Sequence, residues 1–360
     1  MHHPKVLQII YSGLGGQTTV AFNLVKSDAL RQFSWSILFY GIEEVPTQYL
    51  DACNELSIEY IFVKKEMAGG LGIKEQKNIL EYICRTKPKY VLCHLPPIVP
   101  MLSFFRQKCG YTLIVMEHHA NHLKRRIDKL LSKILPKISN QVIYLSHEYR
   151  ATIFKNPPKN THIIPSGIDT NLFSPAENNT TEKIRFGMVA RLVETKDIST
   201  LLRAMNLLRD TSFFSQIELL IAGDGPLRQQ WENETNLLNL RSKVRFVGML
   251  REREVAKLLQ SLSIYLHSSY GETLSTAIMQ AMAVGLPIIA SNVKGIKEQI
   301  VPEKTGLLFT LENAEELAHK INRVLSDKNL NNTLCQQTRE EALQKYSLDS
   351  MFEKYLQILS

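Results

Sequence analysis

The chain has 360 residues, of which 44% are hydrophobic and 22% are charged. This length exceeds what one ordinary core accommodates and predicts two domains. No apolar run approaches the roughly 18 to 20 residues that a membrane-spanning helix requires. Five scattered cysteines without a C-x-x-C pair argue against a disulfide framework and against a zinc site. We therefore expect a cytoplasmic protein without a structural metal.

The net charge of +8 is confined to the first half of the chain, because residues 1–170 contain 21 basic and 13 acidic residues and the remainder balances. The basic residues are densest in 122–138, where six of them accompany one acid and alternate with Leu and Ile at helical spacing. This pattern is typical of a basic amphipathic helix. Two interpretations stay open: a solvated helix over an ordinary core, or a helix that contacts an anionic membrane surface.

Short β-branched or aromatic runs alternate with helical segments along the first half, which predicts a parallel sheet with crossover helices. The expected strands are 6–10, 36–40, 60–63, 90–93, 112–116, 142–145 and 162–164. Together they define an N-terminal Rossmann-like domain over residues 1–170.

A polar, turn-rich stretch from Ser174 to Thr181 interrupts this alternation, and we place an interdomain linker at 171–183. A second alternating series follows, and it predicts a C-terminal Rossmann-like domain over 184–340. Its expected strands are 184–189, 218–222, 244–247, 264–267 and 287–290, with helices that include 198–208 and 273–283.

A glycine turn follows the first strand, at Gly13, Gly15 and Gly16, and a helix is expected directly after it. Unpaired N–H groups and the helix dipole make such a turn a site for anions. The spacing is not the dinucleotide fingerprint G-x-G-x-x-G, so a plain tight turn is an alternative interpretation.

Polar groups also follow the strands of the second half. Arg191 and Lys196 lie five residues apart just after a strand, where two cations can converge on one polyanion. Glu272 and Gln280 are eight residues apart, which predicts that they lie about two turns apart along one side of a helix.

Several motifs at ordered spacing resemble the nucleotide-sugar glycosyltransferases of family 4, which have the GT-B fold of two Rossmann-like domains facing across a cleft. The motifs include IIPSGIDTNLFSP, the Arg191 and Lys196 pair, GDGP at 223–226, the Glu-x7-Gln block running into AMAVGLPIIAS, and TGLLF at 305–309. The resemblance covers almost the whole chain. It implies that the segment 341–360 is a closing helix that crosses back to the first domain.

The resemblance implies transfer of a sugar from a nucleotide diphosphate, with retention of anomeric configuration. Negative charge then develops on the departing diphosphate, and something must stabilise it. The sequence contains no D-x-D motif for a divalent metal. We expect Arg191, Lys196 and the amides of Gly15 and Gly16 to supply the positive charge, without a metal and without a cofactor.

The resemblance also assigns individual residues. Glu272 would bind hydroxyls of the donor sugar, and Gln280 stands where the family usually has the carboxylate that holds the ribose. His118 would lie near the donor sugar and the acceptor. The helix-start amides at Thr273, Leu274 and Ser275 would meet phosphate. The other expected donor-binding residues are Gly223, Val247 and Gly248, and the expected acceptor-side residues are His94, Glu117 and His119.

We expect a UDP-sugar as donor rather than a GDP-sugar, and a saccharide or polyprenyl-linked saccharide as acceptor, with peripheral contact to an anionic membrane. No nucleic-acid motif accompanies the basic residues, so we expect no nucleic-acid partner. Two other classes stay open: a catalytically silent nucleotide-sugar-binding protein, to which Gln280 gives weight, and an NAD-dependent oxidoreductase, which the missing fingerprint disfavours.

Overall fold

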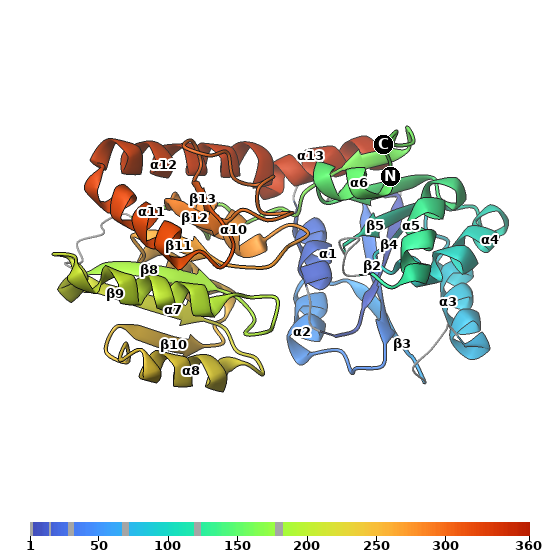
Figure 1. Cartoon of the computed structure of the whole chain (residues 1–360). Coiled ribbons are helices and arrows are strands. Elements are labelled where there is room, and N and C mark those ends of the chain that lie inside the picture. Colours follow the sequence, from blue (N-terminus) through green and yellow to red (C-terminus); the bar gives the residue numbers. More distant parts are fainter. Residues whose placement is uncertain (1–2, 14–15, 28–31, 67–71, 119–123, 177–182) are drawn as a thin grey trace. The chain divides into compact units, whose positions relative to one another are not determined.

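The computed structural model describes the chain except for residues 1–2, 14–15, 28–31, 67–71, 119–123 and 177–182. It divides into two compact units (Figure 1). Unit 1 comprises Met1–Gly167 together with Leu348–Ser360, and unit 2 comprises Ile168–Ser347.

Unit 1 contains a parallel sheet in the order β3-β2-β1-β4-β5-β6-β7. Its strands are β1 Lys5–Tyr11, β2 Ser34–Gly41, β3 Glu59–Lys64, β4 Tyr90–Cys93, β5 Thr112–Glu117, β6 Gln141–Tyr144 and β7 Thr161–Ile163. The strand order reverses between β1 and β4. Crevices for ligands form at the carboxyl ends of strands at such a switch point.

Helices cover both faces of this sheet. They are α1 Gly16–Lys26, α2 Thr47–Glu55, α3 Ile73–Thr86, α4 Val99–Cys109, α5 Arg126–Ile138, α6 His147–Ile153 and α13 Leu348–Leu359. Because successive strand residues point to opposite faces, Leu7 and Ile9 of β1 pack in the core with α3, α4 and α5, whereas Ile10 packs in the core with α1 and α2. The buried Tyr355 of α13 donates its hydroxyl to the sulfur of Met116.

Unit 2 contains a second parallel sheet, in the order β10-β9-β8-β11-β12-β13. Its strands are β8 Ile184–Val189, β9 Ile217–Ala222, β10 Val244–Gly248, β11 Ile264–His267, β12 Ile288–Ser291 and β13 Leu307–Phe309. Two doubly wound sheets confirm the predicted fold class. The edge strand β13 was not predicted, because three residues carry too short a pattern to separate a strand from a loop.

The sheet of unit 2 lies between two hydrophobic cores. Residues of α7 Ile198–Leu207, α8 Arg228–Leu237 and α11 Ala314–Ser326 form one core with the sheet, and residues of α9 Glu252–Gln260 and α10 Thr276–Val284 form the other. The helix α12 Lys328–Glu341 contributes Leu334 to the first core. The switch point of this sheet lies between β8 and β11.

The division into units differs from the predicted boundaries. It falls between Gly167 and Ile168, ahead of the expected linker 171–183, and the chain returns to unit 1 at Leu348 instead of 341. Residues 168–176 belong to unit 2 because Arg339 of α12 holds them: its guanidinium donates to the carbonyls of Thr170 and Phe173. Residues 177–182 of the expected linker lie outside the described residues.

The start of α10 corrects a second prediction. This helix begins at Thr276, so Glu272 lies in the preceding loop and does not share a helix side with Gln280. The reason is the buried Gln299, whose side-chain oxygen accepts from the amide of Ser275 at 2.8 Å and whose side-chain nitrogen donates to the Ser275 carbonyl at 3.1 Å. These bonds hold Ser275 extended, as a helix N-cap.

Candidate functional site

Two loops at the carboxyl edge of the unit 2 sheet are joined by hydrogen bonds. Asp197 caps α7 by accepting from the amide of Thr200 at 3.1 Å, and its other oxygen accepts from the Ser268 hydroxyl at 3.1 Å. The amide of Tyr270 donates to the carbonyl of Thr195 at 3.0 Å. The loop after β8 and the loop after β11 therefore run together, which brings Lys196 next to Glu272.

Glu272 is the centre of this edge. Its Oε1 accepts from the ammonium of Lys196 and, at 3.1 Å, from Nε2 of His267. Burial acts to raise the pKa of Glu272, but the hydrogen bond from His267 and the charge of Lys196 outweigh it and lower the pKa to about 2. Glu272 is therefore an ionised acceptor throughout the neutral range.

His267 supports Glu272 from within the sheet. It ends β11, its side chain is buried, and its Nδ1 lies 3.2 Å from the hydroxyl of Tyr265. Burial lowers the pKa of His267, against the opposing effect of the carboxylate. A neutral imidazole carries one N–H, and its place against an ionised carboxylate puts that proton on Nε2. Sequence reasoning missed His267, although a polar residue ending the apolar run IYLH was the available signal.

The backbone of Glu272 is held by a neighbouring loop. Its amide donates to the carbonyl of Lys294 at 3.1 Å. Gly295 follows with a φ of +80°, and a Cβ there would lie 2.0 Å from the Glu272 carbonyl oxygen. Only glycine allows the two backbones to approach this closely. Gly295 was also missed, since a lone glycine in a loop carries no specific signal.

The expected donor-binding glycines have a packing role. Gly223 has a φ of +127°, and a Cβ there would lie 1.8 Å from the carbonyl oxygen of Ala190. Its amide donates to the carbonyl of Gly248 at 2.7 Å. Val247 is half-buried and packs against the core. These contacts hold the ends of β8, β9 and β10 together behind the loop that carries Lys196.

The remaining predicted residues of unit 2 are placed differently. The amide of Ser275, which we expect to meet phosphate, donates to the side-chain oxygen of Gln299. Thr273 and Leu274 are half-buried in the loop before α10, and Gln280 is half-buried on that helix. Arg191 is exposed just after β8. The structure thus brings Lys196 together with Glu272.

Unit 1 brings His94 together with His118. His94 follows β4 and His118 follows β5, and Nδ1 of His94 lies 3.0 Å from Nε2 of His118. Gly16 is the first residue of α1. Gly15 and His119 lie outside the described residues.

Glu117, which we expect on the acceptor side, is buried at the end of β5. Its buried carboxylate accepts from the ammonium of Lys124 and from the hydroxyls of Ser132 and Tyr149. The side chain of Lys124 is only 8% exposed. Lys124 is thus an internal partner of Glu117 and not part of the basic surface of 122–138, as a buried charge requires a close partner.

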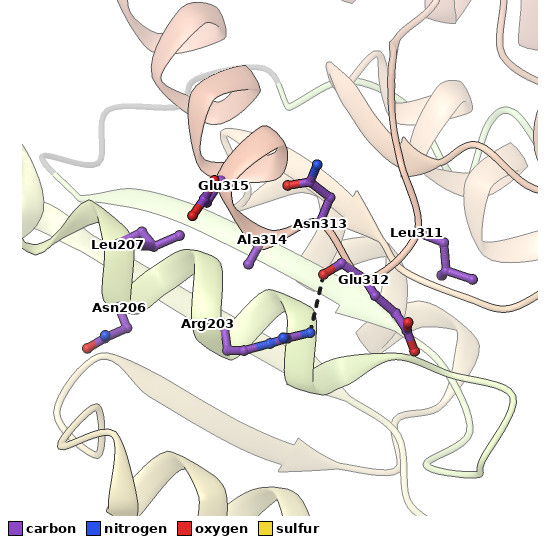
Figure 2. Close-up of a pocket in the computed structure, with 8 residues that line it drawn as sticks. All are labelled: Arg203, Asn206, Leu207, Leu311, Glu312, Asn313, Ala314 and Glu315. Atoms are coloured by element: carbon purple, nitrogen blue, oxygen red, sulfur yellow. Dashed lines mark hydrogen bonds between the residues drawn. The ribbon is translucent and has the colours of Figure 1, made fainter.

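A shallow groove lies elsewhere on unit 2 (Figure 2). It is lined by Arg203, Asn206 and Leu207 of α7 and by residues 311–315 at the start of α11. The guanidinium of Arg203 donates to the Glu312 carbonyl across it at 3.3 Å. None of the predicted site residues lines this groove.

Within the described ranges, no group of three or more His, Cys, Asp or Glu side chains could hold a metal ion. The same ranges contain no helix long and apolar enough to cross a membrane.

Comparisons with known proteins identify similar sequences. Residues 169–341 match the family model described as "Glycosyl transferases group 1". The chain is 26% identical over 309 residues to the Escherichia coli UDP-Gal:alpha-D-GlcNAc-diphosphoundecaprenol alpha-1,3-galactosyltransferase, covering 79% of this chain and 78% of that protein. It is 28% identical to an uncharacterized glycosyltransferase of Methanocaldococcus jannaschii, covering 61% of this chain but only 60% of that protein, less than two thirds of its length.

Solved structures show the same fold. Anabaena HepE in complex with UDP superposes with a TM-score of 0.84 at 17% identity, covering 99% of both chains. Sucrose-phosphate synthase from Thermosynechococcus elongatus superposes with a TM-score of 0.80 at 18% identity, covering 99% of this chain and 98% of that chain. The chain has the GT-B fold.

The close approach at Gly295 gives a testable prediction. We expect Gly295→Ala to displace Glu272, because the new Cβ meets its carbonyl oxygen and the backbone must shift. Gly110 is a matched control: its φ of +74° is similar, and a Cβ there meets nothing within 4 Å. Gly110→Ala should therefore cost only the backbone strain of about 1 to 2 kcal/mol.

Denaturant unfolding measures both variants. We expect Gly295→Ala to lose more unfolding free energy than Gly110→Ala. Equal losses of stability would contradict the proposed support of Glu272 by this loop.

Proposed function

We propose that the chain transfers a sugar from a nucleotide diphosphate sugar, UDP-linked in preference to GDP-linked, to a saccharide or polyprenyl-linked saccharide. The transfer retains anomeric configuration, needs no metal, and serves the synthesis of surface polysaccharide or a related glycan. The arrangement of Lys196, Glu272 and His267 at the carboxyl edge of unit 2 is the observation that carries this proposal.

The chemistry of this arrangement suits sugar transfer. Glu272 is ionised, so it accepts strong hydrogen bonds from sugar hydroxyls. Lys196 supplies a positive charge within reach of the same position, where it stabilises negative charge on a departing diphosphate. The exposed Arg191 lies five residues away and adds a second cation. Because the chain itself supplies this charge, a divalent metal is not needed for it.

The relatives support the choice of substrates. HepE has been crystallised with UDP and glucose, and the name of the E. coli relative specifies UDP-Gal and a GlcNAc-diphosphoundecaprenol acceptor. We infer a UDP-sugar donor and a polyprenyl-linked acceptor for this chain by analogy. Gln280 remains our candidate for the ribose, which it would bind through a neutral and therefore weaker hydrogen bond.

Substitutions at Lys196 and Glu272 test this proposal. We expect Lys196→Ala and Glu272→Ala each to lower release of UDP from a UDP-sugar by at least about tenfold, because each removes a polar group aimed at the donor. The exposed Lys304 serves as a control, and Lys304→Ala should keep the activity of the unchanged chain. EDTA should have little effect on any of them.

A thermal-shift screen of UDP, GDP, NADH and UDP-sugars completes this test, because a ligand that binds the folded state raises its melting temperature. We expect UDP and UDP-sugars to stabilise the chain. Stabilisation by NADH alone would favour an oxidoreductase. Binding of a UDP-sugar without release of UDP, in the presence of polyprenyl-linked acceptors, would indicate a silent nucleotide-sugar-binding protein.

We further propose that α5 contacts the anionic lipids at the inner face of the cell membrane. The inward face of this helix packs Leu135 in the core, yet Ile127 and Leu130 on another face are 70% and 59% exposed. Arg126 and Lys133 are exposed and border these apolar residues on the helix surface. An exposed apolar stripe beside a basic stripe is the arrangement of a helix that lies in a membrane interface.

Charge reversal on α5 tests the membrane contact. The variant Arg126→Glu/Lys129→Glu/Lys133→Glu leaves the buried Lys124 intact. Each basic residue near an anionic surface contributes about 1 kcal/mol, so we expect the affinity for anionic vesicles to fall by roughly 100-fold. Binding by the unchanged chain should also weaken with added salt.

The matched control is Arg241→Glu/Arg253→Glu/Lys304→Glu, which changes the net charge equally through exposed residues of unit 2. Co-flotation with vesicles should be lost by the α5 variant and retained by the control. Equal loss in both would show that net charge alone drives binding. Equal binding of the unchanged chain to neutral and anionic vesicles would also contradict this proposal.

A further inference from the structure

A chain of buried polar side chains runs behind His118 in unit 1. The side-chain nitrogen of Gln8 donates to the carbonyl of Ala21 in α1 at 2.9 Å, and its oxygen lies 3.1 Å from Nε2 of His94. Nδ1 of His94 in turn lies 3.0 Å from Nε2 of His118. Gln8 and His94 are both 0% exposed. These hydrogen-bonded side chains link β1, α1 and the ends of β4 and β5.

The backbone carbonyl of Ala21, at one end of this series of hydrogen bonds, determines which atoms of Gln8 and His94 carry the protons. The Ala21 carbonyl can only accept, so the amide nitrogen of Gln8 faces it and the amide oxygen faces His94. An amide oxygen also only accepts, which requires the proton of His94 to be on Nε2. The ring of His94 is therefore oriented by a fixed acceptor.

The position of the proton on His94 determines the position of the proton on His118. Burial lowers the pKa of His94 to about 3, so its ring is neutral and carries a single proton. With that proton on Nε2, Nδ1 of His94 is an acceptor, and Nε2 of His118 must be the donor. The two rings are 17° from parallel with centroids 5.2 Å apart, which suits an edge-to-edge N–H···N bond between nearly coplanar rings.

We propose that Gln8 and His94 are positioning residues that hold His118 as the tautomer with its proton on Nε2. In the neutral ring the other nitrogen of His118, Nδ1, is then an acceptor. The catalytic meaning of this arrangement rests on the proposed function, in which His118 contacts the donor sugar and the acceptor. The tautomer itself does not depend on that function.

The burial of Gln8 argues for such a role. It lies on the side of β1 that faces α1, where its neighbours along the strand are the buried Val6 and Ile10. An apolar residue would fill this position without needing partners, whereas a buried amide left unpaired destabilises the fold. A fully satisfied polar chain in a core specifies one arrangement of its members. Here the arrangement it specifies is that of the His118 ring.

Nitrogen NMR of the full chain labelled with [15N]histidine tests this proposal. In the unchanged chain we expect His118 and His94 both to show a protonated Nε2 and an unprotonated Nδ1 at neutral pH. We also expect a scalar coupling through the hydrogen bond between Nε2 of His118 and Nδ1 of His94. A proton on Nδ1 of His118, or a mixture of tautomers, would overturn the proposal without any variant.

Two substitutions of Gln8 separate positioning from packing. Gln8→Leu removes the acceptor, so we expect the second tautomer, with the proton on Nδ1, to appear at both histidines. Gln8→Glu, as the neutral acid, keeps an acceptor that faces His94 and a donor that faces the Ala21 carbonyl, so the tautomers and the coupling should persist. If both variants fold and behave alike, Gln8 is only a structural residue and the proposal fails.

The NMR result is also separate from the test of catalysis. An Nε2-protonated His118 in a chain that releases no UDP from a UDP-sugar would contradict the proposed function and leave the tautomer assignment intact. An Nδ1-protonated His118 in an active chain would contradict this inference alone.

Discussion

The buried carboxylate of Glu272 is the constraint on which the carboxyl edge of unit 2 depends. A charge removed from water must be paired. Here Oε1 of Glu272 accepts hydrogen bonds from both the Lys196 ammonium and Nε2 of His267. The surrounding backbone is built to keep these partners in place. Asp197 ties the loop of Lys196 to Ser268, and Gly295 lets a second loop pack directly against the Glu272 backbone. The loops that carry the proposed donor site are therefore held by contacts within unit 2.

Both units use a buried neutral histidine to orient a residue at the edge of the sheet. In unit 2 His267 donates to Glu272, and in unit 1 His94 accepts from His118. Burial lowers the pKa of both histidines, so neither adds charge to its site. A neutral imidazole is suited to this task because it can donate from one nitrogen while the other accepts. The proton position is set by an oxygen that can only accept, the Glu272 carboxylate for His267 and the Gln8 amide oxygen for His94.

The sequence predicted the two parallel sheets well, because buried parallel strands form short apolar runs that end where the polar loops begin. The same rule predicted Arg191 and Lys196 at the edge of the second sheet, but it did not predict that Lys196 contacts Glu272. It could not separate Lys124 from its basic neighbours, because only the fold shows that Lys124 points inward to Glu117 while Arg125 stays exposed.

Other features depend on contacts between residues far apart in the sequence. Gln299 sets the start of α10 from 24 residues away, and Gly295 is required by the carbonyl of Glu272. Gln8 interrupts an apolar strand, and that interruption was the only local signal of the hydrogen bonds that connect Gln8 to His118 through His94. A periodic pattern predicts which face of an element is buried, but it does not predict the hydrogen-bond partners of a buried polar residue.

The pKa of Glu272 most directly tests whether its carboxylate is held ionised by Lys196 and His267. Its lowered pKa means that the ion pair stabilises the fold fully above the ordinary glutamate pKa of 4.5, and that this stabilisation is lost as the pH falls toward about 2. Carbon NMR of the side-chain carboxyl in [13C]glutamate-labelled protein follows this titration. The account predicts that Glu272 stays ionised well below pH 4.5 and that Lys196→Ala moves its titration upward. A Glu272 that titrates at its ordinary pKa, unchanged by Lys196→Ala, would contradict it.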